Sequence, residues 1–143
     1  MEFNHLKDKI TILDGAMGTV LQQKGLPAGG QPELLNLTDP GLIEDVHRAY
    51  IRAGSRVVYT NTFGANRLKL ERTGHATEEI ISAAVGAAKA AAAGTDAAVA
   101  LDVGPLGALL EPLGNLSFQR AYELFREMTE AGAAAGADLI VIE

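Results

Sequence analysis

The segment ADLIVIE, residues 137–143, places four apolar residues in a row before the acid Glu143. A short apolar run without polar alternation is typical of a strand that is covered on both faces. Three earlier stretches share this form, and each ends in a polar residue: ITILDG (10–15) at Asp14, RVVYTNTFG (56–64) at Asn61, and AAVALDVGP (97–105) at Asp102. The four polar ends recur at intervals of 47, 41 and 41 residues, which predicts repeated β/α units.

Helical patterns fill the intervals between these strands. The stretch 39–54 begins with Asp39-Pro40, a cap followed by a first-turn proline, and ends at Gly54. Further helices are predicted over about 77–94 and 117–136, with a shorter one over 65–74. Since β/α crossovers are right-handed, the four strands should run parallel and place their polar ends on one edge. Ligand sites of α/β folds lie at that carboxyl edge.

Two α/β architectures fit this pattern: an open doubly wound sheet, or the first half of an eight-stranded barrel. A doubly wound sheet usually carries a GxGxxG fingerprint in its first turn, and DGAMGTV (14–20) does not match it. A half-barrel, in turn, leaves two unpaired strand edges and an uncovered inner face.

Composition narrows the class of protein. The 143 residues suggest one domain over 1–143, and the net charge of -6 without a basic cluster argues against a nucleic-acid partner. The absence of cysteine excludes disulfides and thiolate metal sites from this chain. The start MEFNHLKDKI lacks the apolar core of a signal peptide, and AAVGAAKAAAAG (83–94) is too short to span a bilayer. We therefore expect a soluble cytoplasmic protein without a membrane partner.

Two of the polar strand ends lie in loops rich in small residues. In LDGAMGT (13–19), Asp14 precedes Gly15 and Gly18. The backbone amides of these glycines either approach a small anionic or zwitterionic ligand, or the glycines only allow a tight turn. In TNTFGAN (60–66), Asn61 belongs to a polar cluster that either lines a pocket or forms a turn and caps the next helix.

The other two strand ends are acids. Asp102 precedes a loop rich in proline and glycine, and it either contacts a ligand or holds that loop by accepting backbone hydrogen bonds. Glu143 follows apolar neighbours, where an unpaired carboxylate is costly, and it either binds an ammonium group or faces solvent. The three histidines do not form a ligand set, so we predict no metal site in this chain.

Taken together, the motifs resemble those of one enzyme family. The sequence contains, in the order of that family, ILDGAMGT (12–19), PELLNLTDP (32–40), VHRAYIRAG (46–54), YTNTFGAN (59–66), ALDVGPLG (100–107), LEPLG (110–114), SFQRAYELF (117–125) and AGADLIVIE (135–143). This order resembles that of the homocysteine S-methyltransferases, and most of all the amino-terminal homocysteine-binding module of cobalamin-dependent methionine synthases. The resemblance covers residues 9–143.

The resemblance implies a TIM (β/α)8 barrel, of which this chain would form the first four β/α units. It implies that Asp14 with the Gly15 turn and Glu143 hold the amino acid end of homocysteine, with Glu143 on the ammonium group. Asn61 and Asp102 would line or support this pocket. The family's chemistry uses a zinc ion held by three cysteine thiolates, and a methyl group carried by cobalamin and recharged from methyltetrahydrofolate by other modules.

This chain departs from the family in having no cysteine. The resemblance implies that the zinc cysteines lie in the second half of the barrel. We therefore expect this chain to be inactive alone and to need the missing half of the barrel. A different hypothesis is a structural half-barrel that self-associates, in which two copies cover each other's strand edges. A third is an intact small α/β domain that binds an anion at DGAMG (14–18).

Overall fold

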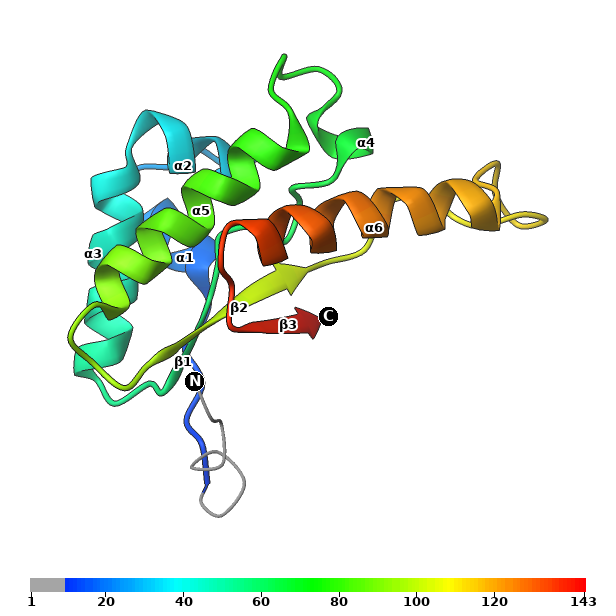
Figure 1. Cartoon of the computed structure of the whole chain (residues 1–143). Coiled ribbons are helices and arrows are strands. Elements are labelled where there is room, and N and C mark those ends of the chain that lie inside the picture. The colour runs from blue at the N-terminus through cyan, green and yellow to red at the C-terminus, as the bar shows by residue number, and fades with distance from the viewer. Residues whose placement is uncertain (1–9) are drawn as a thin grey trace.

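The computed structural model describes residues 10–143; residues 1–9, which form most of the stretch MEFNHLKDKI, lie outside the described residues. Each strand is preceded along the chain by one or more helices (Figure 1). In chain order they are α1 (Met17–Gln23), the 3-10 helix η2 (Pro32–Leu34), α2 (Leu35–Thr38), α3 (Pro40–Arg52), β1 (Val57–Tyr59), α4 (Arg67–Leu70), α5 (Thr77–Ala92), β2 (Ala98–Val103), α6 (Phe118–Ala134) and β3 (Leu139–Ile142).

The strands form one parallel sheet in the order β1-β2-β3. Val57 of β1 pairs with Ala98 of β2, and Ala100 of β2 pairs with Leu139 of β3. The helical segments between them make the two crossovers that parallel pairing requires. The predicted α/β class and the parallel direction of these three strands are therefore confirmed.

The prediction of a full first strand within residues 10–15 was wrong, because this segment makes only one parallel bridge, between Leu13 and Val57. Two hydrogen bonds flank the bridge: Arg56 N–H donates to Ile12 O at 2.8 Å, and Asp14 N–H donates to Val57 O at 3.1 Å. The segment thus lies beside β1 in the expected place. Ile10 and Ile12 are exposed, so the described chain does not cover the outer side of this edge.

The longer predicted helices form where the capping residues indicated. The carboxylate of Asp39 accepts the N–H of Leu42 at 3.2 Å and starts α3, and Gly54 follows the helix with φ +111°. The hydroxyl of Ser117 accepts the N–H of Arg120 at 3.2 Å and starts α6. Helix α4 is shorter than predicted: Asn66 caps it, and the chain continues as turns after Leu70.

Helix α1 was missed, because DGAMGT (14–19) was interpreted as a glycine-rich turn. The helix begins at Met17 and includes Gly18, so only Gly15 lies in the turn itself. Apolar residues at helical spacing explain this outcome: Leu21 is fully buried and packs with Ile43 and Val46 of α3.

Helices α3, α5 and α6 pack side by side, with α5 in the middle, and cover one face of the sheet (Figure 1). The face that α5 buries is rich in alanine, and such small side chains allow close helix packing. Leu101 and Val103 of β2 pack beneath α5 and α6, against residues such as Ile81 and Met128. This cluster is the largest part of the core and fixes the strand whose end carries Asp102.

The opposite face of the sheet has a smaller apolar cluster that consists of strand residues alone. Val57, Ala98 and Ala100 are buried there, with Leu139 and Val141 of β3 partly buried beside them. Strand β3 also differs on the helix-covered face. Its register places Ile140 and Ile142 there, yet they are 48% and 80% exposed, because no helix lies over them within residues 10–143.

None of the helices within residues 10–143 combines the length and the apolar character that crossing a membrane would require.

Candidate functional site at the carboxyl edge

Four of the five predicted site residues line one cavity at the carboxyl edge of the sheet. This cavity, of about 300 Å³, is lined by Asp14, Gly15, Ala16, Met17, Tyr59, Thr60, Asp102 and Glu143. A second hollow of about 240 Å³ shares Met17, Thr60, Asp102 and Glu143 with it and adds Gly18, Pro32, Glu33, Asn61, Thr62 and Phe63. We call the two together the carboxyl-edge pocket. The fifth predicted residue, Asn61, lines its second part.

The Asp14 side chain lines the first part of the pocket and is bound to strand β1. Its Oδ2 atom accepts the backbone N–H of Tyr59 at 2.9 Å. Burial raises the pKa of the Asp14 carboxyl from 3.8 to about 6, although the Tyr59 hydrogen bond opposes the rise. This acid is therefore anchored at one oxygen and gains or loses its proton close to neutral pH.

Asp102 lies near the end of β2 and is only 8% exposed. Its Oδ1 atom is buried and has no hydrogen-bond partner among residues 10–143. Burial, and then the charges of Glu143, Asp14 and Glu33, raise the pKa of the Asp102 carboxyl to about 7. A buried oxygen without a donor is costly, so the Asp102 carboxyl is strained in its charged form and keeps an unused acceptor beside the pocket.

Glu143 follows β3 directly and is exposed at the mouth of the pocket. Its backbone N–H donates to Val103 O at 3.1 Å, which continues the ladder between β2 and β3. Its negative charge contributes to the raised pKa of both Asp14 and Asp102. Glu143 thus disfavours the ionisation of Asp14 and Asp102, and a bound cation would relieve this repulsion.

The two glycines of the first turn have different roles. A Cβ atom at Gly15 would lie 3.0 Å from the ring of Tyr50, so a side chain there would require this ring of α3 to shift. A Cβ atom at Gly18 would meet nothing within 4 Å, and Gly18 lines the second part of the pocket. Gly15 therefore brings the backbone close to α3, whereas Gly18 leaves space.

The side chain of Asn61 is engaged in a contact that the sequence did not reveal. Its amide donates to Pro32 O at 2.7 Å and to Asn36 Oδ1 at 3.1 Å, and Asn36 in turn donates to Asn61 O at 2.8 Å. Asn36 is buried, so the pair joins η2 and α2 to the loop after β1. Asn61 thus supports the wall of the pocket.

Glu33 is a second residue that sequence reasoning missed. It is 7% exposed, lines the second part of the pocket, and accepts the N–H of Gly64 at 2.7 Å. An acid that follows a proline at the start of a short helix would ordinarily be interpreted as a helix-start signal. Only the fold shows that this carboxylate points inward at the loop 61–64.

The described residues offer no metal site: within 10–143, no three His, Cys, Asp or Glu side chains could together hold a metal ion. Glu143, Asp14 and Glu33 lie near enough to raise the pKa of Asp102, but these four acids of the pocket do not form such a group.

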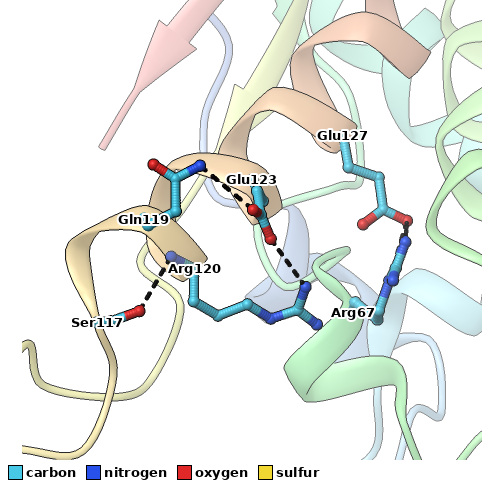
Figure 2. A network of polar contacts seen from close by, with 6 residues as sticks. All are labelled: Arg67, Ser117, Gln119, Arg120, Glu123 and Glu127. Atoms are coloured by element: carbon cyan, nitrogen blue, oxygen red, sulfur yellow. Dashed lines mark hydrogen bonds and ion pairs between the residues drawn. The ribbon is translucent and has the colours of Figure 1, made fainter.

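A separate charged hollow of about 500 Å³ lies between α4, α5 and α6. Figure 2 shows two of its arginines in ion pairs: Arg67 contacts Glu127 at 2.8 Å, and Arg120 contacts Glu123 at 3.4 Å. The third, Arg126, contacts Glu130 at 3.9 Å. Glu123 also accepts a hydrogen bond from the Gln119 side chain, and the Ser117 hydroxyl caps the start of α6. These charges satisfy one another on exposed helix faces, so the carboxyl-edge pocket is the better candidate site.

A family model described as homocysteine S-methyltransferase matches residues 11–143. The chain belongs to this family. It is 43% identical to the methionine synthase of Mycobacterium leprae (strain TN) over 67 residues, which are 43% of this chain and 6% of that protein. The methionine synthase of Mycobacterium tuberculosis (strain ATCC 25618 / H37Rv) matches with the same identity and coverage.

Solved structures of the homocysteine methyltransferase MmuM from Escherichia coli share the fold. The metallated form superposes with a TM-score of 0.82 at 28% identity, over 96% of this chain and 54% of that chain. The apo form superposes with a TM-score of 0.68 at 31% identity, over 94% of this chain and 49% of that chain. The chain thus spans about half the length of these solved homocysteine methyltransferases.

Proposed function

We propose that the carboxyl-edge pocket binds the amino acid end of homocysteine for S-methylation. The observation that carries this proposal is the convergence of Asp14, Asp102 and Glu143 on one cavity, with a buried Asp102 oxygen that lacks a donor. Membership of the homocysteine S-methyltransferase family supports the choice of substrate.

The acids suit the ammonium group of the ligand. Glu143, which is exposed and lines the pocket, would meet the ammonium first, and the Asp102 carboxyl, which lines the same cavity, would accept one of its hydrogens. Asp14 has one oxygen held by Tyr59 and would contribute charge and orientation. The backbone of the Gly15 turn lines the same cavity and would lie against the rest of the amino acid end.

The zinc ion that the family implies does not fit the residues present, and no residue of this chain is assigned to the cobalamin. The sequence has no cysteine, and residues 10–143 contain no group of metal ligands. We therefore derive no step through either group and assign substrate binding alone to this chain. Zinc ligands and methyl donor would come from other parts of the enzyme, and we expect the purified chain to transfer no methyl group alone.

We further propose that the chain forms the first four β/α units of a barrel that a second half completes. The exposed Ile140 and Ile142 on β3 support this, since a following helix of a barrel would cover them. The match to 54% of the Escherichia coli enzyme supports it as well.

Calorimetric titration with L-homocysteine under reducing conditions tests the proposal. We expect saturable binding that weakens about tenfold or more in Glu143→Gln, together with weak or no binding of 4-mercaptobutanoate, which lacks the amino group. Glu130→Gln, an exposed acid on α6, is the matched control and should bind as the natural chain does. Equal binding of the two thiols would refute ammonium recognition, and no binding of either would refute a pocket complete in this chain.

Self-association is the second candidate function, and the exposed apolar residues of β3 favour it. Two copies could pair their β3 edges or cover each other's sheet faces. Light scattering would detect this state: a concentration-independent dimer mass, reduced to monomer by Ile142→Lys, is the expected result. A monomer at all concentrations would exclude it.

A further inference from the structure

The loop that follows β1 is tied to the rest of the molecule at two places. At its start, Asn61 and Asn36 exchange the hydrogen bonds described above. At its end, Glu33 accepts the N–H of Gly64, and the fit leaves no room for a side chain at Gly64, since an added Cβ atom would overlap Glu33 Oε1. Residues 33–36 therefore act as a brace on the loop 61–64.

The same loop reaches Asp102 from its other side. The hydroxyl of Thr62 donates to the backbone carbonyl of Asp102 at 2.7 Å, and the Thr60 hydroxyl accepts the backbone N–H of Asp102 at 3.1 Å. The two hydroxyls also contact each other at 2.7 Å. Thr60 and Thr62 are almost fully buried, so these bonds are shielded from water. The Asp102 carbonyl is thus bound by Thr62 of this loop, and the Asp102 N–H by Thr60, the residue between β1 and the loop.

We propose that Glu33 is a positioning residue of the carboxyl-edge pocket, which holds the loop 61–64 so that the Asp102 carboxyl keeps its place in the lining of the pocket. The identity of the ligand in this inference rests on the proposed function, whereas the hydrogen bonds that hold the loop do not depend on it. The path runs from Glu33 to Gly64, along two residues of backbone to Thr62, and from Thr62 to Asp102. A small displacement of a group that binds the ligand weakens binding, so contacts that hold such a group in place affect the affinity.

Charge offers a competing explanation, because Glu33 also contributes to the raised pKa of Asp102. Two substitutions of similar size separate the explanations. Glu33→Gln removes the charge but keeps an oxygen that reaches Gly64 N–H. Glu33→Asp keeps the charge but shortens the side chain by one methylene, which moves the oxygen away from Gly64 N–H. A positioning role predicts that Gln is tolerated and Asp is not; an electrostatic role predicts the reverse.

Calorimetry on the complete chain with L-homocysteine gives the first readout. We expect Glu33→Gln to bind within about threefold of the natural chain, and Glu33→Asp to bind about tenfold more weakly. Weaker binding by Glu33→Gln with normal binding by Glu33→Asp would overturn the proposal, as would normal binding by both.

Amide hydrogen exchange gives a second readout that needs no ligand. In Glu33→Asp we expect faster exchange at Gly64 that spreads through Thr62 to Asp102, with amides of α6 unchanged. Faster exchange confined to Gly64 would overturn the positioning role even if homocysteine binds. If the natural chain binds no homocysteine, the proposed function fails, and exchange at Asp102 alone decides whether Glu33 positions it.

Discussion

The carboxylate of Asp14 accepts the backbone N–H of Tyr59 at 2.9 Å, so an acid from the first segment is fastened to strand β1. This bond lies one residue beyond the single bridge between Leu13 and Val57. It extends the attachment of the first segment by using a side chain where the backbone ladder has ended. Asp14 is thus both a pocket residue and a structural link.

Replacement of Asp14 should separate these two roles. Asp14→Ala removes the acceptor of Tyr59 N–H, whereas Asp14→Asn keeps a carbonyl oxygen there and removes only the charge. We expect the Ala variant to be less stable than the Asn variant by about 1–2 kcal/mol in urea unfolding, because a partly buried donor is left without a partner. Equal midpoints would show that the bond does not hold the segment.

The stability of the protein should depend on the charge of Asp102. The pKa of its carboxyl is about 7 in the folded chain, above the ordinary value of 3.8. The folded chain therefore binds this proton more tightly than the unfolded chain. The contribution of Asp102 to stability is fully present below about pH 4 and is lost as the pH rises through 7. Asp102→Asn removes this dependence.

We expect Asp102→Asn to be more stable than the natural chain at pH 8, by on the order of 2 kcal/mol, with the difference shrinking toward pH 4. Urea unfolding at a series of pH values measures it. The exposed Asp96→Asn serves as the control and should show a small difference at every pH. A difference for Asp102→Asn that grows toward acid would contradict the raised pKa.

The paired asparagines should behave as one unit. Asn36→Ala and Asn61→Ala each break the same exchange of hydrogen bonds and leave buried polar groups unpaired. Each should lower the unfolding free energy by about 1–3 kcal/mol, and the double variant should cost less than the sum by about 1 kcal/mol. Additive costs in the double-mutant cycle would show that the two side chains act independently.

The sequence predicted the repeated β/α pattern well because its signals are local. Apolar runs define β1, β2 and β3, and Asp39 and Ser117 cap helices at the predicted positions. Placing Asp14, Asp102 and Glu143 on one edge required only parallel strands, and the structure confirms that they share a cavity.

The contacts missed by the sequence are those between distant segments. Nothing local in PELLN (32–36) indicates that Glu33 and Asn36 would meet the loop after β1. The helix α1 was missed because its glycine outweighed the apolar spacing that packs Leu21 on α3. The prediction of a full strand within residues 10–15 was wrong for a related reason. A strand at an edge of the sheet needs a neighbour, and its sequence alone does not show whether one is present.

Two helical glycines give a final test of how closely α6 packs on the sheet. A Cβ atom at the buried Gly132 of α6 would lie 2.5 Å from Leu101 of β2, whereas one at the exposed Gly86 of α5 would meet nothing within 4 Å. Alanine is the better helix former by about 1 kcal/mol at either position, so propensity alone predicts that both substitutions stabilise.

We expect Gly86→Ala to raise the unfolding free energy by about 0.5–1 kcal/mol. Gly132→Ala should lower it by about 1–3 kcal/mol, because Leu101 sits in the main core and cannot move away freely. Thermal and urea unfolding of the two variants measure both effects, and stabilisation by Gly132→Ala would mean that α6 lies further from β2 than this packing requires.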